Sequence, residues 1–80
     1  MQDVEIIHRI DALVEEEHRL ERDHASTGLD ETNLARLREL EEQLDQCWDL
    51  LRQRRARRSA GQNPNEARLR STKVVERYQQ

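Results

Sequence analysis

The stretch LDQCWDLLRQRRARR, residues 44–58, decides the fold. Its first half has the apolar spacing of one helix face, with Leu44, Cys47, Trp48 and Leu51, and its second half is dominated by arginine. Apolar residues every three or four positions indicate a helix face that packs against a core. This face is predicted to end near Leu51, so the helix should continue past the core as a basic end.

Arginines gather immediately after this apolar face, and we predict that they contact a partner. They are Arg52, Arg54, Arg55, Arg57 and Arg58. Residues 1–51 contain fifteen acidic and five basic residues, a net charge of −10, whereas residues 52–80 contain nine basic and two acidic residues, a net charge of +7. This asymmetry favours attraction between copies of the chain, or between the basic end and an acidic protein.

The composition predicts one small all-α domain. The chain has 80 residues, of which 39% are charged and 2% aromatic, with two glycines and one proline. A domain this short buries too little surface to be very stable alone, and oligomerisation is a common remedy. The single cysteine, Cys47, lies on an apolar face and is predicted to be a small core residue rather than a reactive thiol. No apolar run is long enough for a membrane span, and a cytoplasmic location is expected.

Two antiparallel helices are predicted over residues 1–61. The first should run from Val4 to His24 with Asp3 as its N-cap. Its apolar side chains are Ile6, Ile7, Ile10, Leu13, Val14 and Leu20. A turn around Gly28 should follow. Asp30, or alternatively Thr27, should cap the second helix, from Glu31 to Ala60. Two residues that face each other across the hairpin are expected to have residue numbers that add up to about 55.

The remaining residues, 62–80, are predicted to form a short helical or irregular tail. Gly61 suits the end of the second helix, and Asn63 followed by Pro64 suits the start of a short new helix. Val74, Val75 and Tyr78 could dock on the hairpin or on a partner.

Both helices have apolar faces broader than the seam of a simple coiled coil, so a lone hairpin would leave apolar surface exposed. We therefore predict a homodimer in the form of a four-helix bundle, with parallel or antiparallel orientation left open. The residues predicted to support self-association are Ile10, Leu13, Leu37, Leu44, Trp48 and Leu51.

Nucleic acid is an alternative partner, because arginine is well suited to phosphate. Against it, the arginines surround the helix rather than forming a stripe, no aromatic residue alternates with them, and the rest of the chain is acidic.

A metal-binding bundle is a third alternative. Glu15 and His18 have the E-x-x-H spacing of di-metal helical proteins, which need two such motifs and further glutamates. A solvated acidic face explains the same residues, so no cofactor or metal is expected. No catalytic motif occurs and the protein is not expected to be an enzyme. Glu17, which falls within the apolar spacing, could pair with Arg38 or lie hydrated at the edge of the face.

Four segments resemble a family of short actinobacterial proteins catalogued only as a domain of unknown function. They are IDALVEEEHRL (residues 10–20), LEEQLDQCWDLLRQRRARRSAG (40–61), NPNEARLR (63–70) and VVERY (74–78). The resemblance implies a small all-helical bacterial protein whose tail is part of the domain. It implies no activity, cofactor, partner or site residue.

Overall fold

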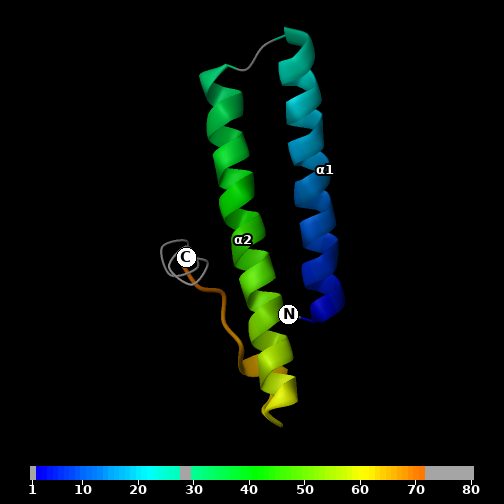
Figure 1. The fold of residues 1–80 in the computed structure, drawn as a ribbon, viewed down its shortest axis with the longest axis vertical. Coiled ribbons are helices and arrows are strands. Elements are labelled where there is room, and N and C mark those ends of the chain that lie inside the picture. The colour runs from blue at the N-terminus through cyan, green and yellow to red at the C-terminus, as the bar shows by residue number, and fades with distance from the viewer. Residues whose placement is uncertain (1, 28–29, 72–80) are drawn as a thin grey trace.

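A computed structural model describes residues 2–27 and 30–71 and confirms the predicted helical hairpin. Two long helices, α1 (Asp3–Thr27) and α2 (Glu31–Ser59), are followed by a short 3-10 helix, η1 (Pro64–Glu66). The long helices lie side by side and antiparallel (Figure 1). The described part of the chain contains no strand, and neither long helix has an apolar stretch that could cross a membrane.

The two ends of α2 are formed by the residues predicted for them. The side chain of Asp30 accepts a hydrogen bond of 2.8 Å from the backbone amide of Asn33. At the other end Gly61 has a φ of 74°, its amide donates to the carbonyl of Arg58, and the amide of Gln62 donates to the carbonyl of Arg57. This pair of bonds is the Schellman motif, which needs a residue with positive φ and therefore favours glycine.

The start of α1 differs from the prediction. Asp3 is the first residue of the helix rather than its N-cap, and its carboxylate contacts α2 instead of the backbone of its own helix. The carboxylate of Glu5 serves the helix start, because it accepts a hydrogen bond of 3.1 Å from the amide of Gln2. The turn predicted around Gly28 lies outside the described residues.

The core is a cluster of apolar side chains between the two helices, with Ala67 of the tail packed against it. The buried members are Ile6, Ile10, Leu13, Leu40, Leu44, Cys47, Leu50 and Leu51. Four of the six residues predicted for self-association, Ile10, Leu13, Leu44 and Leu51, therefore pack inside one chain and stabilise the hairpin itself. Leu37 is half-buried, and Trp48 is 46% exposed.

The register agrees with the sequence expectation to within a few residues. Asp3 contacts Arg54, and Glu16 contacts Arg36 through two hydrogen bonds, one of them 2.9 Å long. The ion pair across this part of the hairpin thus involves Glu16 and Arg36 rather than Glu17 and Arg38. Glu17 is half-buried, and Arg38 is exposed.

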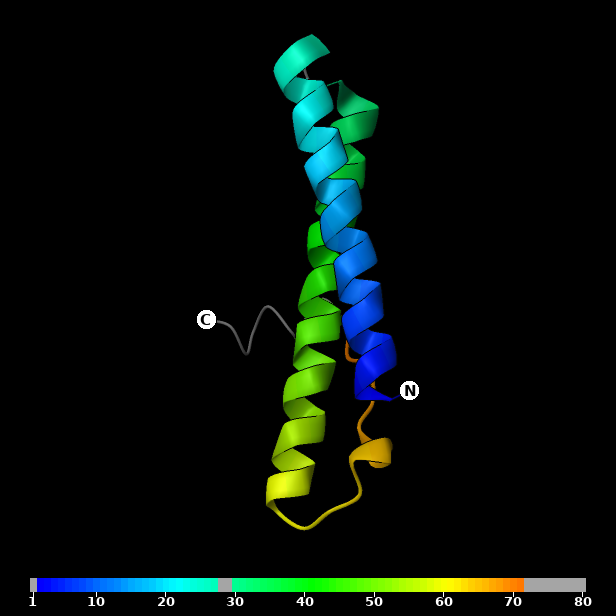
Figure 2. The ribbon, with the colours of Figure 1, turned by 90° about the vertical axis from the view of Figure 1, so that its right-hand side faces the viewer.

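The tail turns back after Gly61 and runs along one flank of α2 (Figures 1 and 2). The side-chain amide of Gln46 donates to the carbonyl of Arg70 at 3.1 Å, and that of Gln53 donates to the carbonyl of Arg68 at 2.6 Å. Asp49, only 3% exposed, lies between them and forms an ion pair with Arg70. The tail is therefore attached to α2 at Arg68 and Arg70. The predicted docking of Val74, Val75 and Tyr78 falls outside the described residues.

Candidate interaction surfaces

One carboxylate joins the free ends of the two helices. The Nε atom of Arg54 donates to Oδ1 of Asp3, and Nη2 of Arg58 donates to Oδ2 at 2.6 Å. The two arginines are four positions apart on α2, so a single side chain at the start of α1 reaches both. We call this arrangement the Asp3 junction.

Arg54 also connects the junction to the tail. Its Nη1 atom donates to the carbonyl oxygen of Pro64 at 3.2 Å and to the side-chain oxygen of Asn65 at 3.0 Å. With only 4% of its surface exposed, Arg54 belongs to the interior. The expectation that α2 leaves the core after Leu51 is therefore wrong for Arg54, because η1 covers the helix one turn further on.

The other four predicted partner-binding arginines differ in what they contact. Arg58 pairs with Asp3, and Arg57 lies 3.5 Å from a carboxylate oxygen of Glu66. Arg52 and Arg55 are exposed, and neither forms an ion pair with any residue in the described ranges. Arg52 and Arg55 are thus exposed without an ion pair in the described part of the chain, whereas Arg54 is buried.

The Asp3 junction lowers the pKa of the Asp3 carboxyl group. Hydrogen bonds from Arg58 and then Arg54 lower the pKa of Asp3 from 3.8 to about 2, because they stabilise the charged form. The hydrogen bond from Arg36 lowers the pKa of Glu16 for the same reason. Both carboxylates remain ionised well below neutral pH and hold the two helices together through charge-assisted hydrogen bonds.

The flank of the hairpin away from the tail carries most of the exposed apolar side chains. On α2, Trp48 points away from Gln46 and Gln53, which bind the tail, because successive residues of a helix turn by about 100°. On α1, Ile7 is 44% exposed and lies near the level of Trp48. We call this flank the open face. Its apolar residues, assigned from their positions around the two helices, are Val4, Ile7, Leu34, Leu37 and Trp48.

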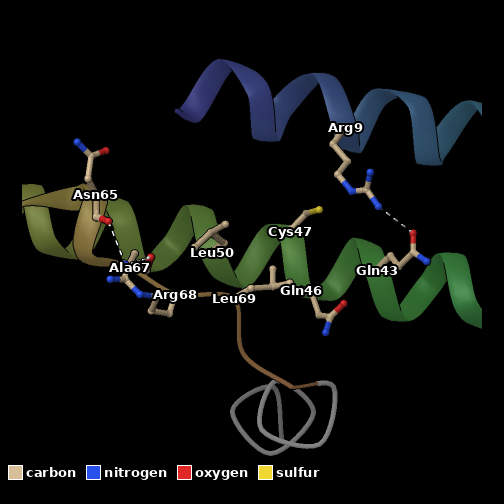
Figure 3. A pocket seen from close by; sticks show the side chains of 9 residues that line it. All are labelled: Arg9, Gln43, Gln46, Cys47, Leu50, Asn65, Ala67, Arg68 and Leu69. Carbon is tan, nitrogen blue, oxygen red and sulfur yellow. Dashed lines mark hydrogen bonds between the residues drawn. The ribbon is translucent and has the colours of Figure 1, made fainter. Parts of the chain in front are cut away.

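A pocket of about 370 Å³ lies on the opposite flank, where the tail meets both helices. Figure 3 shows that α1 contributes Arg9 to its lining, α2 contributes Gln43 and Cys47, and the tail contributes Leu69. Arg9 donates a long hydrogen bond of 3.5 Å to Gln43. Burial raises the pKa of the Cys47 thiol, which favours its protonated and less reactive form.

No cluster of three or more His, Cys, Asp or Glu side chains with metal-site geometry occurs among residues 2–27 and 30–71. Glu15 and His18 are both exposed on α1. The described part of the chain thus offers surfaces, an ionic junction and a pocket beside the tail.

Comparison with known proteins finds relatives along almost the whole chain. The family described as "Protein of unknown function (DUF2630)" matches residues 2–80. The chain is 46% identical over 77 residues to the uncharacterized proteins Rv0898c of Mycobacterium tuberculosis and Mb0922c of Mycobacterium bovis. The match covers 95% of this chain and 88% of each relative. No solved structure matches the chain significantly.

The burial of Arg54 leads to a first prediction. We expect Arg54→Gln to lower the free energy of unfolding by about 2–4 kcal/mol, because it removes the donor to Oδ1 of Asp3 and to the η1 acceptors, and leaves Asp3 with Arg58 alone. Arg38→Gln, which removes the same charge from an exposed position of α2, should leave stability nearly unchanged. Urea unfolding followed by circular dichroism measures both. Equal effects of the two substitutions would contradict the buried junction.

The lowered pKa of Asp3 leads to a second prediction. A carboxyl whose pKa is lower in the folded state stabilises the fold above its unfolded pKa of about 4 and loses this effect as the pH falls toward 2. With solvent screening, we expect Asp3→Asn to cost about 1–2 kcal/mol at pH 5.5 and much less at pH 2.5. Asp11→Asn, at an exposed position of the same helix, is the control. A constant difference between wild type and Asp3→Asn across this range would exclude the proposed linkage.

Proposed function

The chain belongs to the DUF2630 family, and we propose that it is a non-enzymatic helical interaction module that self-associates through the open face. The observation that carries this proposal is the exposure of Trp48, the largest side chain of α2, at 46% on the flank that the tail leaves uncovered. Tryptophan is among the residues that contribute most to protein interfaces.

The neighbours of Trp48 support an interface. Ile7 and Val4 on α1 are exposed by 44% and 56%, and they lie toward the same end of the hairpin as Trp48. Contiguous exposed apolar side chains on a small protein typically mark an interaction site. A second hairpin placed on this flank would complete a four-helix bundle, the usual way in which two broad apolar helix faces are covered.

The second part of the proposal assigns Arg52 and Arg55 to an acidic partner surface. Both are exposed and form no ion pair within the described residues, so their charges are available. They also border the open face, because they continue the helix stripe of Trp48 by one and two turns. A partner on the open face would therefore meet these two charges at its edge.

Nucleic acid is the weaker candidate for the same residues. Affinity for a phosphate backbone grows with the number of cations that contact it. Of the five arginines at this helix end, only two lack an ion pair within the described residues. A metal site involving Glu15 and His18 has no further support in the described residues. The cytoplasmic location stays a prediction.

Self-association should depend on Trp48. We expect Trp48→Ala to raise the dissociation constant of the dimer at least about ten-fold, since truncation of a tryptophan anchor costs 2 kcal/mol or more. Sedimentation at micromolar concentrations measures the change. Leu69→Ala is the matched control, because Leu69 is 59% exposed but lies on the tail flank.

A helical wild-type monomer at these concentrations would overturn the proposal, as would equal effects of the two substitutions. Substitution of Leu44 is not a clean test, because Leu44 is buried within one chain and its loss would unfold the hairpin.

A gel-shift titration separates the protein partner from nucleic acid. We expect no micromolar binding to RNA or DNA at low salt. Tight, salt-sensitive binding that is lost in the double variant Arg52→Gln and Arg55→Gln would instead favour the nucleic-acid function. This double variant leaves the buried Arg54 intact, so it should not disturb the fold.

A further inference from the structure

Four charged residues and Trp48 form a stripe along α2. The stripe consists of Glu41, Asp45, Trp48, Arg52 and Arg55, with successive spacings of four, three, four and three residues. This alternation keeps side chains along one side of a helix. The stripe is therefore a continuous line of side chains along the open face, with the tryptophan at its centre.

The charges of this stripe change sign at Trp48. Both residues before it are acidic and both residues after it are basic, and Glu41 and Arg55 lie seven positions from it on either side. Glu41, Arg52 and Arg55 are exposed, and Asp45 is half-buried. Within residues 2–27 and 30–71 none of these four forms an ion pair. Four charges thus border the exposed tryptophan without an ion-pair partner in the described part of the chain.

We propose that a second copy of the chain binds to the open face. The α2 helices of the two copies are antiparallel and are related by a two-fold axis at the level of Trp48. The inference rests on the proposed self-association and adds its orientation and register. With the axis at Trp48, residues equally distant from it in opposite directions face each other. Glu41 and the partner's Arg55, each seven positions from the axis, then face each other. Asp45, three positions before the axis, lies within one residue of the level of the partner's Arg52, four positions after it.

Charge complementarity selects this orientation over the parallel one. A two-fold axis makes each contact occur twice, so the antiparallel dimer has four oppositely charged pairs around the two tryptophans. A parallel dimer in register would place Glu41 against the partner's Glu41 and Arg55 against the partner's Arg55. Like charges facing each other oppose association, and opposite charges fix the register.

The arrangement also agrees with the rest of the fold. The acidic surface sought by Arg52 and Arg55 is supplied by the same helix of the other copy, so no additional acidic protein is required. The tail contacts Gln46, Asp49 and Gln53 on a different flank of α2, and it would not have to move. Ile7 of α1 lies near the level of Trp48 and would flank the axis.

Charge reversal tests the orientation. In the antiparallel dimer, Glu41→Arg places an arginine against the partner's Arg55, and Arg55→Glu places a glutamate against the partner's Glu41. We expect each single variant to raise the dissociation constant about ten-fold, and the double variant with both substitutions to restore wild-type affinity within about three-fold. Sedimentation measures the affinities, and circular dichroism confirms that each variant remains helical.

Glu42→Arg provides the matched control, because it makes the same charge change at an exposed position turned by about 100° from the stripe. It should leave the dimer unchanged. In a parallel dimer each residue of the stripe faces its own copy, so like charges face each other in the wild type and in every variant. No single charge reversal should therefore weaken a parallel dimer.

The outcomes separate the two proposals. Self-association stands if the wild type dimerises and Trp48→Ala weakens the dimer. The proposed orientation is nevertheless wrong if the single charge reversals have no effect, or if the double variant does not regain the affinity of the wild type. If the wild type does not dimerise, both proposals fail.

Discussion

The contact of Asp3 with Arg54 is the constraint on which the rest of the structure depends. The buried cluster of apolar side chains holds α1 against α2, but it does not define where the two helix ends meet or where the tail goes. Arg54 does both, because one edge of its guanidinium binds the start of α1 and the other binds the carbonyl of Pro64 and the side chain of Asn65. Its charge is compensated by Asp3, which makes burial of the group tolerable.

This constraint gives the hairpin two different flanks. The tail, directed by Gly61 and held at Arg54, covers the flank of α2 that carries Gln46, Asp49 and Gln53. The flank with Trp48 is left uncovered, and the charges beside it remain unpaired within the described residues. An otherwise simple pair of helices thereby has one closed side and one side suited to a partner.

Much of this fold could be predicted from the sequence because its signals are local. Asp30, Gly61 and Asn63 are cap residues whose function depends on the neighbouring backbone, and the apolar spacing of each helix shows its buried face. The antiparallel hairpin and the short helical turn after Asn63 could be predicted for the same reason. The family could be predicted from four segments of the sequence.

The Asp3 junction was not accessible in this way. It joins residues that are 51 positions apart in the sequence, and an aspartate before a helix is well explained as an N-cap. Arg54 stands among similar arginines, so nothing local distinguishes the one that η1 covers. The sequence predicted exposed apolar surface on the hairpin, but it did not separate the open face from the core. The reason is that one broad apolar face includes both Leu44, which is buried, and Trp48, which is exposed.

The sequence distance across the Asp3 junction has a consequence for how the chain folds. Contacts near the turn close short loops and cost little entropy, whereas the contact of Asp3 with Arg54 closes a loop of 51 residues. The helices are therefore expected to pair progressively from the turn, with the junction closing last. The same order in reverse makes the junction the first part of the hairpin to open. The native-state fluctuation of lowest energy would then separate the start of α1 from η1 while the paired helices near the turn stay together.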